Sequence, residues 1–427
     1  MFLHPLGNRF YKLMIAKAKR LQNDNFTNGS RRASNKESMM QFFTGYIEGF
    51  YGKLLAWQDR DRLLDGLEAV GMTSYFYAPK DDACHRQFWR QTYDAAWRRA
   101  FKRFTGKAVT KDIKIIAGIS PGLDFDFASL DQADAAGGDF NILLDKALML
   151  LADGANVIAL LMDDVAADFD LRAGSFTSEG TAHAVLTNRL GAALNAPIIL
   201  VPRIYADSLI KSDDPQSKTY LKDLARDLEP HHKVVYCGDD IVAVQPGNDR
   251  DGCLHPSKVI IWDNFYANDY CPRRLFLGPW RAVNLPDVML NPTGMIETDL
   301  LLLDLMSLFK NQRQKTESYL RPEHLASWRK AISKRGVPDA FFVISYYLDT
   351  PHGFPMNFVR PSTDDALAAL EILLWRWKAP LQREWYSCLM GLKQDILLSD
   401  GQLSLERLEK TQLQPLVSRV NSLNVNS

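Results

Sequence analysis

The sequence predicts an α/β protein, a (β/α)8 TIM barrel followed by a C-terminal, mostly helical domain. Three observations favour this fold. Short apolar runs alternate with helical patterns over about 270 residues, which is the usual size of such a barrel. The alternation stops after about Lys310. The first run is followed by Gly49-Phe50-Tyr51-Gly52, which is not the glycine-rich phosphate-binding turn typical of an open, doubly wound sheet.

Eight apolar, β-rich runs are expected to form the strands of the barrel. They comprise residues 42–47, 74–78, 113–119, 156–162, 197–201, 234–237, 259–262 and 288–290. Helical patterns lie between them. Leu63 and Leu67 recur at helical spacing, and Gly71 ends that pattern. Further along, Asp139 is placed to cap a helix that Gly154 ends.

The alternation also suggests where the domains begin and end. We assign residues 41–310 to the catalytic barrel and residues 311–427 to a C-terminal helical domain. Within the latter, residues 341–348 are apolar enough to form either a strand or a buried helix. Residues 1–40 are basic and rich in Asn and Ser, which indicates a disordered tail or an upstream start codon, with Met39 or Met40 as the true start.

Composition excludes several classes of function. Basic and acidic side chains number 51 each, so no net charge draws the chain to nucleic acid or to an anionic membrane. No apolar run reaches the roughly 18 residues of a membrane span. The five cysteines are widely spaced without a C-x-x-C motif, which is typical of a reducing compartment, and we expect a cytoplasmic protein. His231-His232 has no carboxylate cluster at ligand spacing, so neither a metal nor a cofactor is expected.

Polar and aromatic side chains gather where the expected strands end. In a TIM barrel the loops after the strands converge on one rim, which carries the active site. Amides and carboxylates bind hydroxyl groups, and flat rings pack against a pyranose, so this pattern is typical of a sugar site. The strand ends concerned are residues 48–52, 77–82, 120–124, 163–164, 203–205, 262–270 and 291–292.

The adjacent pair Asp163-Asp164 is the candidate catalytic centre. Two carboxylates in an apolar barrel mouth repel each other, which separates their pKa values, so that one stays charged while the other keeps a proton as general acid. The alternative is an ordinary pair of aspartates on a solvated loop. In addition, successive side chains of a strand point to opposite faces, so both serve one site only if the strand has ended or twisted there.

Four blocks carry a resemblance to a known family. They are GYIEGFYG at 45–52, YAPKDD at 77–82, Asp163-Asp164, and WDNFYANDY at 262–270. In this order, and each at a strand end, they resemble the signature blocks of glycoside hydrolase family 84. The resemblance covers residues 43–291 and includes RLFLGP at 274–279.

The resemblance implies a retaining β-N-acetylglucosaminidase that works by substrate-assisted catalysis through an oxazoline. Asp163 would orient and polarise the 2-acetamido group of the substrate, and Asp164 would act as general acid and then as general base. A neutral amide oxygen is a weak nucleophile, so a preorganised carboxylate on its N–H is chemically reasonable. Substrate-assisted families are known exceptions to the scheme with an enzyme nucleophile.

The resemblance also implies which residues bind the sugar. Asp269 and Asn291 would hold its 4- and 6-hydroxyls. Lys80 would bind a hydroxyl beside a main-chain contact at Gly49. The residues that would enclose the acetamido pocket and the nascent ring are Tyr205, Asn264 and Trp262.

Other interpretations stay open. A catalytically inactive GlcNAc-binding module would keep the hydroxyl contacts but lose a catalytic acid, and a scaffold barrel would leave the polar strand ends unexplained. Lys80 can simply pair with a neighbouring aspartate, and Asp269 can cap a helix. The glycoconjugate bearing the GlcNAc is a protein, a muropeptide or an oligosaccharide. The aromatic helical region around Trp375, Trp377 and Trp385 would suit a homodimer interface.

Overall fold

The computed structural model describes residues 43–130, 137–243, 246–247, 249–271, 274–281, 286–310, 322–348 and 358–399. The expected tail at residues 1–40 lies outside the described residues. The described chain forms two compact units. The barrel unit contains the residues up to Asn264 together with 286–291, and the helical unit contains 265–281 and the residues from Pro292 onward. A domain boundary at residue 310 stays a prediction.

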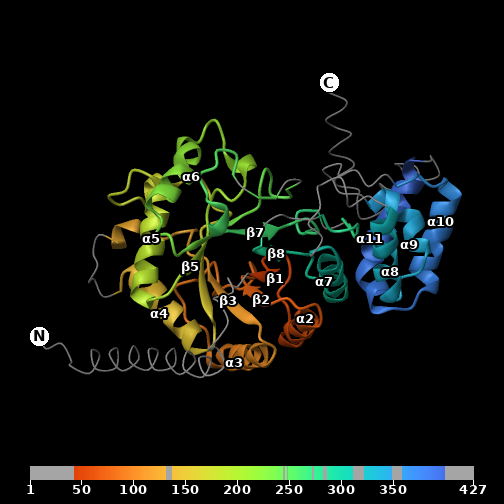
Figure 1. Cartoon of the computed structure of the whole chain (residues 1–427), viewed down its shortest axis with the longest axis horizontal. Helices are drawn as coiled ribbons and strands as arrows, with labels where there is room; N and C mark the ends of the chain where they lie inside the picture. Colours follow the sequence, from red (N-terminus) through yellow and green to blue (C-terminus); the bar gives the residue numbers. More distant parts are fainter. Residues whose placement is uncertain are drawn as a thin grey trace, which may run out of the picture. The chain divides into compact units, whose positions relative to one another are not determined.

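Eight parallel strands close into a barrel, in which β8 pairs with β1 through Met289 and Gly45 (Figure 1). The predicted (β/α)8 barrel is therefore confirmed, with strand ends that differ from the expected ones by at most two residues. The strands are β1 Thr44–Glu48, β2 Ser74–Tyr77, β3 Lys114–Ile119, β4 Val157–Leu161, β5 Ile198–Val201, β6 Lys233–Tyr236, β7 Val259–Asp263 and β8 Val288–Leu290.

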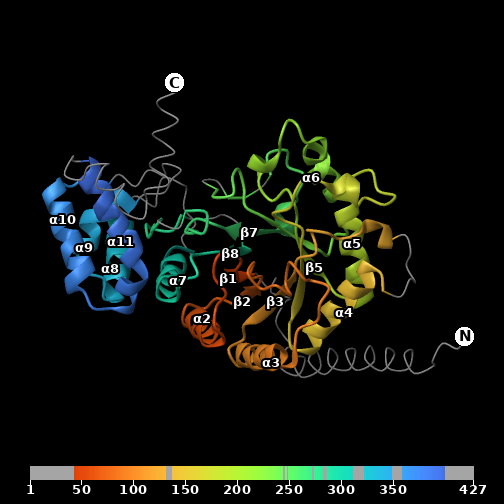
Figure 2. The ribbon, with the colours of Figure 1, turned by 180° about the vertical axis from the view of Figure 1, so that it is seen from behind.

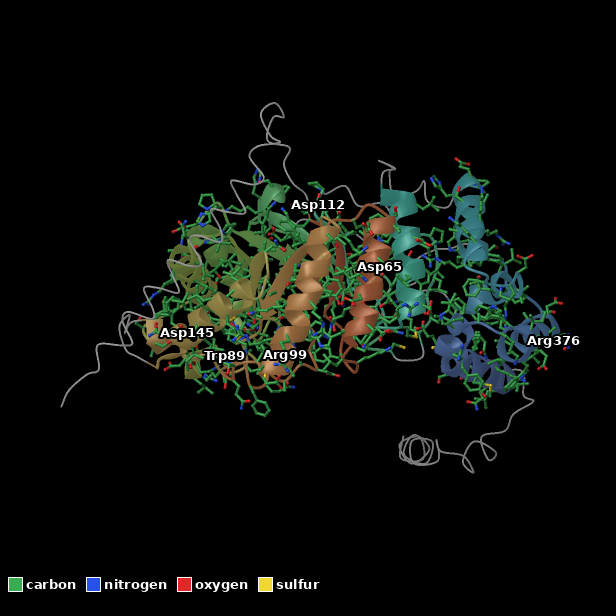
Figure 3. The ribbon with its side chains drawn as sticks, turned by 90° about the horizontal axis from the view of Figure 1, so that it is seen from below. Asp65, Trp89, Arg99, Asp112, Asp145 and Arg376 are labelled. Carbon is green, nitrogen blue, oxygen red and sulfur yellow. The ribbon has the colours of Figure 1, made fainter. Side chains whose placement is uncertain are left out.

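Helices surround this barrel on its outside (Figures 1 and 2). In the barrel unit they are α2 Trp57–Ala69, α3 Ala95–Thr110, α4 Asp139–Ala152, α5 Glu179–Leu194 and α6 Pro215–Asp227. Neighbouring helices are tied by ion pairs as well as by packing. Asp65 of α2 lies 3.0 Å from Lys107 of α3 and 2.9 Å from Lys111, which directly follows α3, and Figure 3 shows the two helices side by side.

The start of α4 corrects one expectation. Asp139 is not the capping residue, because Gly138 holds that position and Asp139 is the first residue inside the helix. Its carboxylate instead accepts two hydrogen bonds from the guanidinium of Arg90, at 2.7 and 2.6 Å. The helix ends before Gly154, as expected, and this glycine has a positive φ of 103°.

One apolar cluster fills the inside of the barrel, because its members come from all eight strands. Within a strand they recur at every second residue, as Ala159 and Leu161 do on β4. Most of the alternate residues, which face the helices, are also apolar. Glu48 is an exception, and its carboxylate accepts two hydrogen bonds from Arg60 of α2. Strands buried on both faces give continuous apolar runs, which explains why the sequence located them so well.

The helical unit is built from α7 Ile296–Lys310, α8 Pro322–Lys334, α9 Ala340–Ile344, the 3-10 turn η6 Ser345–Leu348, α10 Thr363–Glu371, the π-helical turn η7 Ile372–Arg376 and α11 Pro380–Ser399. The segment left open between strand and helix is thus helical. Glu384 of α11 accepts the backbone N–H groups of Glu297 and Thr298 and so caps α7. No helix in the described ranges has the length and apolar character to cross a membrane.

The aromatic residues considered for a dimer interface differ in their burial. Trp385 is completely buried and donates a 2.9 Å hydrogen bond from Nε1 to the hydroxyl of Thr298. Trp377 is also buried, with its ring centroid 5.4 Å from that of Trp385. These two rings are therefore core residues of the helical unit, and this part of the expectation is corrected. Trp375 is 43% exposed and lies beside Tyr386.

Candidate active site

The predicted site residues of the barrel unit continue the inward pattern of the strands. Four of them lie two positions beyond a residue of the interior cluster, so their side chains are directed into the mouth of the barrel. The pairs are Ala78 with Lys80, Leu161 with Asp163, Trp262 with Asn264, and Met289 with Asn291. The C-terminal ends of the strands thus bring these side chains together, as the sequence predicted.

Lys80 faces both candidate catalytic carboxylates. Its buried ammonium donates a short hydrogen bond to Oδ2 of Asp163 and lies 3.5 Å from Oδ2 of Asp164. Both aspartates therefore face one cation, and the alternative of an ordinary aspartate pair on a solvated loop is wrong for Asp163, which is buried.

The backbone of Asp164 explains how adjacent residues face the same side. Its φ is +54°, in the left-handed region that non-glycine residues seldom adopt but that aspartate tolerates better than most. β4 has ended at Leu161, and this turn of the chain rotates the second carboxylate back toward the first. The alternation of strand faces is thus broken at Asp164.

Two phenol groups hold the carboxylate of Asp164. Tyr205 donates to Oδ1 at 2.7 Å, and Tyr51 donates to Oδ2 at 2.8 Å. Tyr205 was predicted to belong to the site, but Tyr51 was not singled out. The signal was present, because Tyr51 lies in the GYIEGFYG block that ends β1.

These surroundings separate the pKa values of the two carboxyl groups. Burial raises the pKa of Asp163, and the charge of Asp164 adds to this, against the lowering effect of Lys80. Burial also acts to raise the pKa of Asp164, but Lys80 and the two phenol donors outweigh it and lower that pKa below its usual value. Asp164 is therefore the group of the pair that favours the charged form.

A chain of amide hydrogen bonds joins the ends of β1, β7 and β8. The backbone N–H of Gly49 donates to Asn291 Oδ1 at 3.1 Å, and Nδ2 of Asn291 donates to Asn264 Oδ1 at 2.8 Å. Trp262 donates from Nε1 to the same oxygen at 3.0 Å. The side chain of Asn264 in turn donates to the carbonyl of Ile241 at 2.9 Å. Four predicted site residues thus form one connected network.

Gly49 has no room for a side chain. A Cβ atom at this position would lie 2.2 and 2.5 Å from two carbons of the Trp262 ring. That ring is buried and packs edge-on against Phe76, with centroids 5.7 Å apart. The close approach is possible only for glycine, which accounts for this residue at the end of β1.

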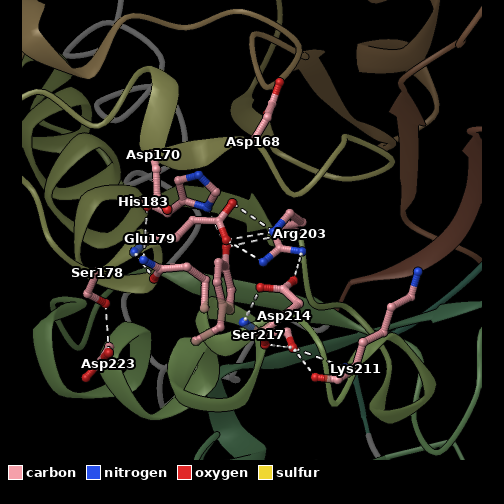
Figure 4. A network of polar contacts seen from close by, with 12 residues as sticks. Asp168, Asp170, Ser178, Glu179, His183, Arg203, Lys211, Asp214, Ser217 and Asp223 are labelled. Carbon is pink, nitrogen blue, oxygen red and sulfur yellow. Dashed lines mark hydrogen bonds and ion pairs between the residues drawn. The ribbon is translucent and has the colours of Figure 1, made fainter.

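The loop that carries Tyr205 is fixed by a buried ion-pair network. Nε of Arg203 donates to both oxygens of Glu179, at 2.8 and 2.7 Å, and Nη1 lies 2.9 Å from Asp214. Figure 4 shows Arg203 between these two carboxylates. The backbone N–H of Arg203 also donates to the hydroxyl of Tyr220. Arg203 is two residues before Tyr205, so the ion pairs that restrain Arg203 also restrain the loop that carries Tyr205.

Asp269 belongs to the helical unit. It lies in a turn of the loop after β7, where its carboxylate accepts the backbone N–H of Tyr270 at 3.0 Å. It does not cap a helix there. Its role toward the sugar hydroxyls stays a prediction.

One group of side chains has the composition of a metal site. Glu229, His231 and His232 each offer a ligand atom, and these atoms lie within 4.8 Å of one another. Glu229, two residues before this histidine pair, was not among the residues predicted from the sequence. Nδ1 of His232 already accepts the backbone N–H of Ile198 at 3.0 Å. The group precedes β6 and is thus at the opposite end of the barrel from Asp163.

Comparisons with known proteins identify the family of the chain. The model of the beta-N-acetylglucosaminidase (NAGidase) family matches residues 44–317. The protein O-GlcNAcases of Mus musculus and Rattus norvegicus are each 30% identical to the chain over 277 residues. That match covers 61% of this chain but only 29% of each relative, so the chain spans less than a third of their length.

A solved structure shares the fold. A mutant of the Thermobaculum terrenum O-GlcNAc hydrolase superposes with a TM-score of 0.65 over 87% of both chains, at 21% sequence identity. The family model covers more than half of the chain and includes all the site residues discussed above. The chain therefore belongs to the beta-N-acetylglucosaminidase family of glycoside hydrolases, family 84, whose motifs its sequence resembles.

Proposed function

We propose that the chain is a retaining β-N-acetylglucosaminidase that removes terminal β-linked GlcNAc, including O-GlcNAc on proteins, through an oxazoline intermediate. The observation that carries this proposal is the adjacent carboxylate pair facing Lys80 at the mouth of an apolar barrel. The chain's place in the beta-N-acetylglucosaminidase family supports it.

Asp163 is suited to act on the acetamido group. Its Oδ1 is buried, and no donor among the described residues reaches it. A buried acceptor without a partner is unfavourable, so the N–H of an incoming amide would be bound strongly there. The charged form of Asp163 would then stabilise the positive charge that develops as the amide oxygen attacks the anomeric carbon.

Asp164 is suited to the proton transfers, provided that the substrate changes its surroundings. Tyr51 and Tyr205 donate to its carboxylate and stabilise its charged form. A glycosidic oxygen that binds Asp164 would displace these donors, and an N–H on Asp163 would favour the charge there. Both changes shift the proton of the coupled pair toward Asp164, which then protonates the leaving oxygen and later deprotonates water.

The remaining residues are proposed to bind the sugar. An amide side chain has two N–H groups and two oxygen lone pairs, so Asn291 keeps binding capacity beyond its bonds to Gly49 and Asn264. We assign the 4- and 6-hydroxyls to Asn291 and Asp269, and a further hydroxyl to Lys80. The proposed pocket for the acetamido group and ring is formed by Tyr205, Asn264 and Trp262.

The first test is hydrolysis of an aryl N-acetylglucosaminide by the purified chain. We expect turnover, and we expect the rate to fall steadily as the acetyl methyl hydrogens are replaced by fluorine, because fluorine weakens the amide oxygen as nucleophile. Turnover that is insensitive to fluorination would mean an enzyme nucleophile. Binding of GlcNAc without any turnover would instead indicate the inactive binding module.

The second test separates the two aspartates. Asp164→Ala should retain more activity on aryl glycosides with good leaving groups than on alkyl glycosides, because a good leaving group needs less protonation. Asp163→Ala should lower both rates by similar factors. If the two variants show the exchanged pattern, the assigned roles are reversed.

We also propose a cytoplasmic location and a GlcNAc-bearing glycoconjugate as substrate. The cysteines of the chain are free thiols, of which Cys237 and Cys388 are buried, and this fits a reducing compartment. Fluorescence microscopy of the tagged full chain would test the location. A signal confined to a secretory compartment would contradict it.

A further inference from the structure

We propose that Arg86 is a positioning residue for catalysis, which acts by holding the backbone of the aspartate pair so that Asp164 faces the reaction. This inference rests on the proposed function. Nη2 of Arg86 donates to the backbone carbonyl of Asp164 at 2.7 Å, and Nη1 lies 3.5 Å from the carbonyl of Asp163. The guanidinium thus spans two consecutive carbonyls.

The position of this contact matters because Asp164 has a left-handed backbone conformation. Such a conformation persists only where its surroundings fix it. A charge-assisted hydrogen bond to the carbonyl of the same residue does this directly. Without it, the backbone would relax toward the extended region, and alternation would turn the Asp164 side chain away from Lys80.

Arg86 is itself held in a rigid turn. Oδ1 of Asp82 accepts the backbone N–H groups of Cys84 and His85, at 3.0 and 3.2 Å. The carbonyl of His85 accepts the backbone N–H of Ser120, which docks the turn on the end of β3. These contacts place Arg86 without any help from the aspartate pair.

Further bonds hold both sides of the same turn. The ammonium of Lys146, on α4, donates to the carbonyls of Cys84 and Trp89. Oδ2 of Asp82 accepts the hydroxyls of Tyr77 and Tyr93, at 2.5 and 3.1 Å. The turn is therefore rigid. Through its guanidinium, Arg86 holds the backbone of Asp164 in a fixed position relative to this turn.

The consequence is a defect specific to proton transfer. Arg86→Gln should lower kcat on an aryl glycoside of intermediate leaving group by about 10- to 100-fold, because a displacement on the order of 1 Å has effects of that size. KM should change little. The loss should be larger for alkyl glycosides and smaller for strongly activated ones, as for loss of Asp164 itself.

A double-mutant cycle distinguishes positioning from general structural support. If Arg86 acts through Asp164, then Arg86→Gln should cause less than about a twofold further loss in an Asp164→Ala background. Arg90→Gln is the matched control, because Arg90 belongs to the same loop as Arg86 but forms ion pairs with Asp124 and Asp139. Its effect should be small and equal in both backgrounds.

Arg86→Lys keeps one cationic donor near the carbonyl, so its kcat should lie between those of the wild type and Arg86→Gln. This variant also keeps the test available if Arg86→Gln fails to fold. Equal losses from Arg86→Gln in both backgrounds, or an unchanged kcat, would overturn the positioning role while leaving the proposed function intact. An inactive wild-type chain would instead refute the proposed function, and the role of Arg86 would fall with it.

Discussion

The hydroxyl of Tyr205 donates a 2.7 Å hydrogen bond to Oδ1 of Asp164, and Tyr51 occupies the other oxygen. The residue proposed as general acid is therefore stabilised in its charged form before substrate binds, with its pKa lowered by Lys80 and the two phenols despite burial. The raised pKa belongs to Asp163, mainly because of burial. The proposed mechanism therefore requires the proton preference of the pair to reverse when substrate binds.

The phenol donors should set the upper pH limit of the reaction. In Tyr205→Phe or Tyr51→Phe, a donor to the charged form of Asp164 is lost, so the pKa of Asp164 in the free enzyme should rise. The acid form then persists to higher pH, and the basic limb of the kcat/KM profile should move upward. Tyr236→Phe, whose hydroxyl donates to Asp207, is the control. If the basic limb of the kcat/KM profile stays in place or moves to lower pH in both tyrosine variants, the proposed role of Asp164 as general acid is contradicted.

Lys80→Met should change how stability depends on pH. The pKa of Asp163 is raised in the folded state, so folding takes up a proton there and stability falls as pH rises from the unfolded pKa through the folded one. Removing the lysine that lowers this pKa widens that window toward higher pH. We expect a melting temperature that falls more steeply than in the wild type as the pH rises above the ordinary range of an aspartate, whereas Lys107→Met, in a surface pair with Asp65, should follow the wild type. A flatter dependence in Lys80→Met would be inconsistent with this.

The sequence predicted the strands well because the pattern that predicts them also stabilises them. Residues 288–290 form the last strand as expected, since the barrel buries both faces of its strands. Helix starts were less predictable. Asp139 has the right chemistry for a cap, but Arg90, from a distant loop, binds its carboxylate inside the first turn.

In the site, residue types and strand ends were enough to predict the side chains that point inward, such as Lys80 and Asp163. They were not enough to predict that Asp164 faces the same way, because that depends on one backbone angle. The contact that fixes this angle joins Arg86 to a residue 78 positions away, through a backbone carbonyl. Since every residue has a carbonyl, the sequence carried no signal for it.

Dimerisation through the helical unit stays a prediction, and the burial of its tryptophans decides how to test it. Replacing Trp385 would damage the core rather than an interface. The exposed pair Trp375 and Tyr386, with ring centroids 5.9 Å apart, is the better target. We expect the full chain to sediment as a dimer at micromolar concentration and Trp375→Glu to sediment as a monomer. Val359→Glu, at a position that is 88% exposed, should stay dimeric. A wild-type chain that sediments as a monomer would contradict the predicted dimerisation.

Two glycine-to-alanine substitutions should change the free energy of unfolding in opposite directions. In Gly49→Ala, the new methyl group would meet the Trp262 ring at 2.2 Å, so the ring must move and the bonds through Asn264 and Asn291 are strained. We expect a loss of about 1–3 kcal/mol in the free energy of unfolding together with reduced turnover. Gly106 lies within α3, and a Cβ there meets no atom within 4 Å, so Gly106→Ala should stabilise by about 0.5–1 kcal/mol through helix propensity, with normal kinetics. Denaturant unfolding and steady-state assays on both proteins measure this. If Gly49→Ala is as stable and active as Gly106→Ala, the close approach of Gly49 to Trp262 has no role in the site.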